Sequence, residues 1–136
     1  EDYLGYNNVM DAVLVGVGSL GKALISYKGF ANYGLNIIAA FDNDPQTIDE
    51  VIGDCRVRPI SEMEEICKRL RIHIGIITVP AEAAQSACDD LLASGILAIW
   101  NFAPVHLNAP ENVLIQNENM AASLAMLSRK LKETTR

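Results

Sequence analysis

The sequence has 136 residues, of which 50% are hydrophobic and 21% are charged, so its length and composition are those of one compact globular domain. With 17 acidic and 11 basic residues the formal net charge is −6, which makes the chain itself a poor ligand for nucleic acid phosphates. No apolar run approaches the roughly 20 residues of a membrane-spanning helix, so we expect no membrane partner, and no signal peptide is recognisable.

The chain has three cysteines, Cys55, Cys67 and Cys88, at spacings that match neither a zinc site nor a CxxC motif. Two of them fall in helical patterns, so we expect reduced thiols at or near the core and a cytoplasmic location. A redox-active thiol pair is the alternative. Residues 1–8 are polar and linker-like and begin with Glu1 rather than Met, from which we expect a fragment of a longer protein.

The first half of the chain alternates strand and helix. Residues 10–16 form an apolar run that ends in glycine, as in a strand covered on both faces of a parallel sheet. A helix follows and stops at residues 31–34, and its apolar residues recur at helical spacing: Leu20, Ala23, Leu24 and Tyr27. Residues 35–42 predict a second buried strand, and Asp44 before Pro45 predicts the N-cap of a short helix.

The second half continues this alternation. Its apolar runs predict strands over residues 56–59, 72–79, 96–102 and 113–115. Ser61 and Glu64 predict a capping box for a helix that runs through Leu70, and a helix over residues 81–94 ends before Gly95. Strands that alternate with helices predict an α/β fold, with a doubly wound, mostly parallel sheet and helices on both faces.

A last helix is expected from about Asn119 to Lys132. Its apolar stripe is spaced by four, three and four residues, as in a heptad: Met120, Leu124, Leu127 and Leu131. Such a stripe either closes the helix onto its own domain or packs on a second subunit, and the spacing alone leaves both readings open.

The segment GVGSLG is a GxGxxG motif that follows a strand and opens a helix, which is the context of a Rossmann dinucleotide-binding fingerprint. Gly16 permits the tight turn, Gly18 lets the pyrophosphate approach, and Gly21 lets the helix pack closely on the sheet. The N–H groups at the helix N-terminus then face the diphosphate. We therefore assign cofactor binding to the whole loop: Gly16, Val17, Gly18, Ser19, Leu20 and Gly21.

Asp42 ends the second strand 21 residues after Gly21, where the fingerprint requires an acid. Its carboxylate is expected to accept hydrogen bonds from the adenosine ribose and to repel a 2′-phosphate, which selects NAD over NADP. Asn43 follows it in the expected site, and the next residues include no basic one. A glycine turn that binds nothing, or another adenine nucleotide such as coenzyme A, is the alternative.

Two further turns follow strand ends, where open α/β sheets bind ligands. The candidate cofactor-binding residues in these turns are Thr78, Val79, Pro80, Asn101, Phe102 and Ala103. These turns are expected to wall a nicotinamide ring, although ordinary strand-ending turns explain the pattern equally well.

A dehydrogenase needs a proton donor or acceptor beside its hydride site, and the sequence offers few candidates. His73 is expected at the end of its strand away from the ligand crevice, whereas His106 is better placed but has no obvious acidic or basic partner. Glu82 is more simply a helix-dipole residue, and there is no nucleophile elbow, P-loop lysine or metal-ligand cluster. We therefore expect a cofactor sensor and no enzyme, with a small NAD-dependent oxidoreductase as the rival.

Five segments resemble the Rex family of redox-sensing transcriptional repressors: GVGSLGKAL, IIAAFDNDP, GIITVPAEAAQ, WNFAPVHL and NENMAASLAMLSRKL. They follow the family's order, and the match as a whole covers residues 3–131. TVPAEAAQ and NFAP are far more specific than the glycine motif. The resemblance implies a homodimeric bacterial repressor whose Rossmann domain binds NADH and NAD⁺. It also implies that operator DNA is bound only through an N-terminal winged-helix domain, which is missing from this sequence.

The resemblance further implies a division into a linker at 1–8, an NAD(H)-binding domain at 9–116 and a dimerisation helix at 117–136. In the family that C-terminal helix is exchanged between subunits. The residue that matches Asn119 is an aspartate in well-known members, where it takes part in a redox-dependent polar contact. Because Asn119 cannot carry that charge, we expect a switch that is wired differently, for example through Glu118, or that responds differently.

Overall fold

The computed structural model describes residues 10–118 and 120–134, so the expected linker at 1–8 and Asn119 lie outside the described residues. Seven strands form one sheet in the order β3-β4-β2-β1-β5-β6-β7. The strands are β1 (Met10–Val15), β2 (Leu35–Asp42), β3 (Val51–Ile52), β4 (Cys55–Pro59), β5 (Ile74–Ile77), β6 (Ala98–Asn101) and β7 (Leu114–Asn117). The helices are α1 (Ser19–Ser26), α2 (Met63–Leu70), α3 (Ala81–Ala93) and α4 (Met120–Thr134).

The sheet is doubly wound and mostly parallel, as the sequence predicts. Strand β1 lies at its centre and pairs in parallel with β2 on one side and β5 on the other. The carboxyl ends of these strands are therefore neighbours: Val15 is in register with Phe41 of β2 and with Ile77 of β5. The one antiparallel pair joins β3 to β4 at the edge of the sheet. The chain thus reverses its winding direction beside β1, which is where open α/β sheets bind their ligands.

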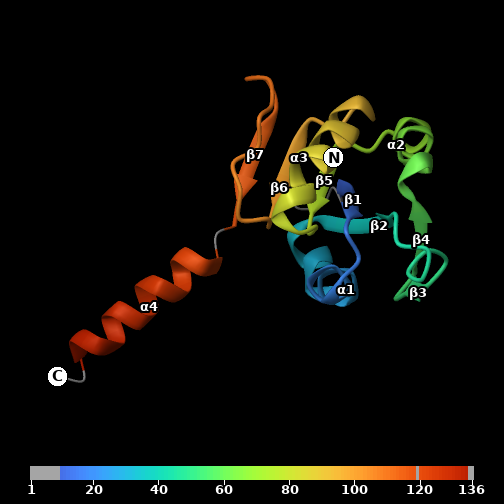
Figure 1. The fold of residues 1–136 in the computed structure, drawn as a ribbon. Helices are drawn as coiled ribbons and strands as arrows, with labels where there is room; N and C mark the ends of the chain where they lie inside the picture. Colours follow the sequence, from blue (N-terminus) through green and yellow to red (C-terminus); the bar gives the residue numbers. More distant parts are fainter. Residues whose placement is uncertain (1–9, 119, 135–136) are drawn as a thin grey trace.

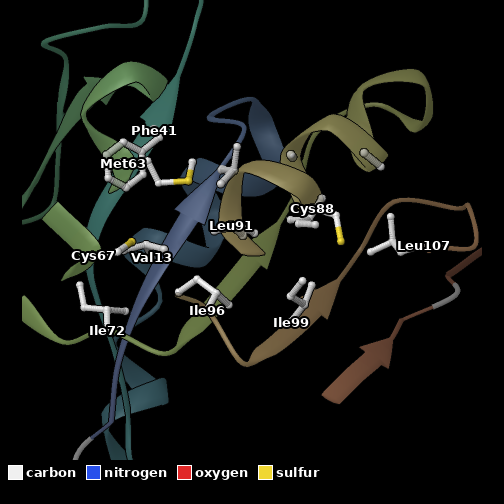
Figure 2. Close-up of a cluster of buried hydrophobic side chains, with 14 of the residues drawn as sticks. Val13, Phe41, Met63, Cys67, Ile72, Cys88, Leu91, Ile96, Ile99 and Leu107 are labelled. Atoms are coloured by element: carbon white, nitrogen blue, oxygen red, sulfur yellow. The ribbon is translucent and has the colours of Figure 1, made fainter. Parts of the chain in front are cut away.

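Helices cover both faces of this sheet (Figure 1). Side chains of β1 alternate between the faces, so that Leu14 packs with Leu24 of α1 whereas Val13 packs in the cluster below α2 and α3. Figure 2 shows this second cluster, which Met63 of α2 and Leu91 of α3 close over the strands. Both faces of the central strands are covered, which explains why residues 12–16 and 37–41 are apolar throughout.

All three cysteines are buried and free, as the helical patterns around two of them predict. In Figure 2, Cys67 on α2 and Cys88 on α3 lie at separate places in the core. Burial raises the pKa of the Cys67 thiol to about 11, and burial also raises the pKa of Cys55 and Cys88. These thiols are therefore protonated near neutral pH and are poor nucleophiles, which disfavours the redox-active pair.

The short helix predicted after Asp44 does not form, and that prediction is wrong. The Asp44 carboxylate does accept hydrogen bonds from Gln46 N (3.0 Å) and Thr47 Oγ1 (3.3 Å), as an N-cap does. The turn ends at Asp49, however, whose φ is 75° and whose N–H donates to Val57 O (2.8 Å). Pairing with β4 therefore overrides the helix signal, and the chain continues into β3, which the sequence analysis missed.

The predicted capping box of α2 is also wrong, although the helix ends at Leu70 as expected. A 3₁₀ turn over Ile60–Glu62 precedes the helix, so that Glu62, and not Ser61, is the N-cap residue, and no side chain caps it. The Glu62 carboxylate instead accepts two hydrogen bonds from the Arg58 guanidinium, each 2.8 Å long. A salt bridge to β4 has replaced the local cap.

Helix α4 extends away from the sheet and its covering helices (Figure 1). Residues 124–134 are exposed, and Leu124 and Leu127 each keep 64% of their surface accessible. The reading in which this stripe closes onto its own domain is thus not what the structure shows. Exchange of the helix with a second subunit is not tested by one chain and stays a prediction. Across the described ranges, no helix combines the length and apolar character required to traverse a bilayer.

Candidate dinucleotide-binding site

The glycine loop lies directly against the turn between β5 and α3. Gly16 has φ 98°, and a Cβ atom there would lie 2.6 Å from Val79 Cγ1 and 2.8 Å from Val79 N. A Cβ atom on Gly21 would collide with the backbone oxygen of Gly16 and lie 3.1 Å from Thr78 Oγ1. Both glycines are therefore required by close packing within the protein, in the roles that the fingerprint assigns to them.

Gly18 is different, because a Cβ atom there would meet no protein atom within 4 Å. It is the exposed N-cap residue of α1, and no side chain caps this helix end. Protein packing therefore gives no reason for glycine at this position. Close approach of a ligand to the free N–H groups at the start of α1 does give one.

Asp42 joins the end of β2 to the glycine loop. Its Oδ2 accepts a hydrogen bond from Val17 N (2.8 Å), and its Oδ1 accepts from Asn43 N (2.7 Å) and Asp44 N (3.0 Å). A carboxylate offers about four acceptor positions, so three protein contacts leave about one for a ribose hydroxyl. The sequence analysis gave Asp42 only the ribose, and its anchoring of the loop was missed.

Thr78 holds the loop from the other side. Its N–H donates to Val15 O (2.9 Å), and its hydroxyl donates to Gly16 O, 2.6 Å away, with Val15 O at 3.1 Å. The hydroxyl hydrogen is thus used within the protein. Thr78 fixes the position of the glycine loop, and a direct cofactor contact from this hydroxyl would have to use its remaining acceptor capacity.

A cavity of about 640 Å³ opens over the carboxyl ends of β1, β2, β4 and β5, within the size range of ligand sites. Eight predicted cofactor residues line it: Gly16, Val17, Gly18, Asp42, Asn43, Thr78, Val79 and Pro80. Ser19, Leu20 and Gly21 belong to the first turn of α1 and do not line it. The structure therefore brings together residues from three separate segments of the sequence in one cavity.

The predicted residues after β6 lie elsewhere. Asn101 is fully buried, where its amide donates to Val105 O (3.2 Å) and Asn117 Oδ1 (3.0 Å) and its Oδ1 accepts from Ala103 N (3.0 Å). Phe102 packs against Trp100, with ring centroids 4.8 Å apart. Ala103 lines a separate cavity of about 270 Å³. Asn101 thus shapes the turn and ties β6 to β7, and a nicotinamide contact from these residues stays a prediction.

The cavity also contains residues that the sequence analysis did not single out. They are Val15, Asp44, Thr47, Ile60, Ala83, Ser86, Ala87 and Asp90. Four of them lie on α3 with the spacing of one helix face, a signal that was readable once α3 was placed beside the glycine loop. The sequence analysis predicted this helix but assigned none of its residues to the site.

The cavity is acidic, because Asp42, Asp44 and Asp90 line it and no lysine or arginine does so within the described residues. Two cationic side chains on α1 and β4 have acidic partners: Lys22 pairs with Glu50 (3.3 Å), and Arg58 pairs with Glu62 and Asp49. A phosphate on the ribose beside Asp42 would find no cation here. That arrangement favours an unphosphorylated ribose.

Neither histidine lines this cavity. His73 is exposed, and its Nδ1 lies 3.4 Å from Gly95 O, outside the cavity lining, as expected. His106 lines the smaller cavity, and Glu118 lines it too. The sequence analysis missed this acidic residue because it lies twelve positions further along the chain. Within residues 10–118 and 120–134, no three His, Cys, Asp or Glu side chains are grouped as metal ligands are.

The sequence and the fold match known proteins along almost the whole chain. The model of the CoA binding domain family matches residues 7–105. Identity to the redox-sensing transcriptional repressor Rex of Porphyromonas gingivalis is 45% over 132 residues, which cover 97% of this chain and 61% of that protein. Identity to the Rex of Pelotomaculum thermopropionicum is 44% over 128 residues, covering 94% and 60%. The chain therefore spans about three fifths of the length of these relatives.

Solved structures give the same result. The fold superposes on the crystal structure of RSP, a Rex-family repressor, with a TM-score of 0.89 and 34% identity, covering 96% of this chain and 63% of that one. The same repressor has been crystallised in complex with beta-NADH, and with beta-NAD⁺ and operator DNA.

Proposed function

The chain belongs to the CoA-binding domain family, and from its similarity to Rex repressors we propose that it is the NAD(H)-sensing domain of a redox-responsive transcriptional repressor. The observation that carries this proposal is the joint arrangement of Gly18 and Asp42. An open glycine at the start of α1 faces the same cavity as a carboxylate that has about one acceptor position free. A diphosphate beside Gly18 and a ribose beside Asp42 are the two groups that an adenine dinucleotide would place there.

The experiment that tests the ligand class is a set of parallel calorimetric titrations of the chain with NADH, NADPH and coenzyme A. We expect tight binding of NADH and little binding of the other two, because each of these carries a phosphate on the adenosine ribose and the cavity lining supplies no cation for it. Binding of coenzyme A in competition with NADH would instead favour the CoA-binding module. Consumption of NADH with an aldehyde or keto-acid substrate would favour the oxidoreductase, whereas the curated relatives are repressors.

We also propose that the domain works as a homodimer through α4. The support is the exposed apolar stripe of that helix, including Leu124 and Leu127, together with its extension away from its own sheet. A second copy is the occupant that the proposal names, since the resemblance to Rex implies exchange of this helix. The division into a linker at 1–8, a cofactor domain at 9–116 and a dimerisation helix at 117–136 belongs to the same proposal.

DNA binding is assigned to a part of the protein outside this chain. The relatives are longer than the matched region, and the Rex-family repressor RSP forms a complex with operator DNA. The acidic net charge of −6 supports a separate DNA-binding segment, because phosphate contacts need basic surface. The three buried, free thiols support a cytoplasmic location.

The proposed mechanism is a population shift between two relative orientations of the subunits. NADH and NAD⁺ differ by one charge and by the planarity of the nicotinamide ring, so they can favour different orientations. A ligand shifts such an equilibrium only by its difference in affinity for the two states. The resemblance to Rex implies that NADH releases operator DNA, which requires that NADH and NAD⁺ differ in their relative affinities for the two orientations.

A further inference from the structure

One face of α3 lines the dinucleotide cavity at the end that the glycine fingerprint does not use. Ala83, Ser86, Ala87 and Asp90 follow the spacing i, i+3, i+4 and i+7, so they lie on a single stripe of the helix. Ile60, which follows β4, lines the same cavity from the other side of the sheet's switch point.

The stripe has the shape and chemistry of a seat for a flat ring. Ala83 and Ala87 are small and apolar, and Ile60 supplies an apolar wall. Asp90 comes seven residues after Ala83, about 10 Å further along the helix axis and thus further from the glycine loop. A dinucleotide with its diphosphate at Gly18 and its ribose at Asp42 places its base in this part of the cavity.

Asp90 is the charged group at the far end of this seat. Its side chain is half-buried and makes no hydrogen bond or ion pair within the described parts of the chain, whereas its backbone oxygen accepts from Ser94 N (3.1 Å) and Ser94 Oγ (2.8 Å). Burial, and after it the neighbouring Asp89 carboxylate, raise the pKa of Asp90. A partly desolvated carboxylate without a donor gains more from a ligand N–H than an exposed one does.

We propose that Asp90 accepts a hydrogen bond from the exocyclic amine of adenine, so that α3 selects adenine dinucleotides over those with a 6-oxo purine. Adenine presents an N–H donor at C6, whereas hypoxanthine presents a carbonyl oxygen, which a carboxylate repels. The inference rests on the proposed function, because it names the part of the same cavity that recognises the base.

The test compares the binding of NADH and of reduced nicotinamide hypoxanthine dinucleotide to the chain and to three variants, by titration calorimetry. The two ligands differ in the C6 substituent of the purine and in the hydrogen that hypoxanthine carries at N1. For the unaltered chain we expect NADH to bind about tenfold more tightly, as for one hydrogen bond to a charged group. Asp90→Ala is expected to bind both ligands equally, and Asp90→Asn to lose most of the preference because its amide can serve either purine.

Glu82→Gln is the matched control, since Glu82 is exposed on the same helix and does not line the cavity. It is expected to keep the preference for NADH. The inference is overturned if the unaltered chain binds both dinucleotides equally, or if Asp90→Ala retains the full preference. Absence of NADH binding to the unaltered chain would instead overturn the proposed function itself, so the two failures are distinguishable.

Discussion

At the scale of single residues, the candidate site is held together by side chains that also line its cavity. Asp42 accepts hydrogen bonds from three backbone N–H groups and lines the cavity. The Thr78 hydroxyl donates its hydrogen to the backbone oxygen of Gly16 in the glycine loop. The loop is therefore held in its binding geometry before a ligand arrives. Such preorganisation reduces the entropy that is lost on binding.

The anchoring role of Asp42 predicts a change in stability that a residue contacting ribose alone would not cause. Asp42→Ala leaves the N–H of Val17 without its acceptor in a partly buried place, so we expect a loss of about 1–3 kcal/mol in the free energy of unfolding in urea. Asp44→Ala removes an acid from the same cavity with contacts only to its own turn, and serves as the control. If Asp42→Ala weakened NADH binding and left the unfolding free energy unchanged, the anchoring role would be refuted.

The two kinds of glycine in the loop predict opposite phenotypes. Gly16→Ala places a Cβ against Val79 at a φ of 98°, so we expect destabilisation of at least about 1–2 kcal/mol, measured by thermal or urea unfolding. Gly18→Ala meets no protein atom, so the chain should remain as stable as before yet bind NADH much more weakly. A Gly18→Ala variant with unchanged NADH affinity would contradict the assignment of the diphosphate to this position.

The buried thiols predict slow chemistry in the folded state. The pKa of Cys67 is raised to about 11, and all three thiols are buried. We therefore expect Ellman's reagent to react slowly with the folded chain. After unfolding in urea, all three thiols are expected to react quickly. The reaction rate should rise with pH, since the thiolate is the nucleophile. A thiol that reacts rapidly at neutral pH would revive the redox-active pair.

At the scale of the elements, the sequence predicted correctly the helices, strands and turns whose formation depends on a local residue pattern. The apolar runs of β1 and β2, the helix that ends before Gly95 and the glycine turn are local signals, and the structure confirms each of them. The wrong predictions are those in which a tertiary contact replaces a local one. Asp49 donates to Val57 of β4 where a short helix was predicted, and Arg58 binds the Glu62 carboxylate at the start of α2, where a capping box was predicted. The part of the site that lies on α3 was missed for the same reason, because only the fold shows which face of this helix lines the cavity.

Helix α4 gives a prediction at this scale. The double substitution Leu124→Glu and Leu127→Glu puts charge on an exposed apolar stripe, so we expect it to abolish dimers and to leave NADH binding to the glycine loop measurable. Ser128→Glu adds a charge on the same exposed helix and is the control. Sedimentation velocity reads the result, and an unaltered chain that is monomeric at every concentration would refute the dimer.

At the scale of the whole molecule, the fold places its ligand cavity and its C-terminal helix on separate parts of the structure. The cavity lies over the ends of the central strands, whereas α4 follows β7 at the edge of the sheet and extends outward (Figure 1). Between them lie β6 and β7, which the buried Asn101 joins through Asn117, and the Trp100 indole donates to Glu118 (3.1 Å) just before α4. These contacts tie the end of β7 to β6 immediately before α4 begins.

The central claim is that this domain distinguishes the two redox forms of one cofactor, and the most direct measurement is a pair of calorimetric titrations with NADH and NAD⁺ under identical conditions. We expect NADH to bind more tightly by at least about fivefold, the lower end of typical coupling free energies. Equal dissociation constants for NADH and NAD⁺ would contradict the account, because the domain would then not distinguish the two redox forms by its binding.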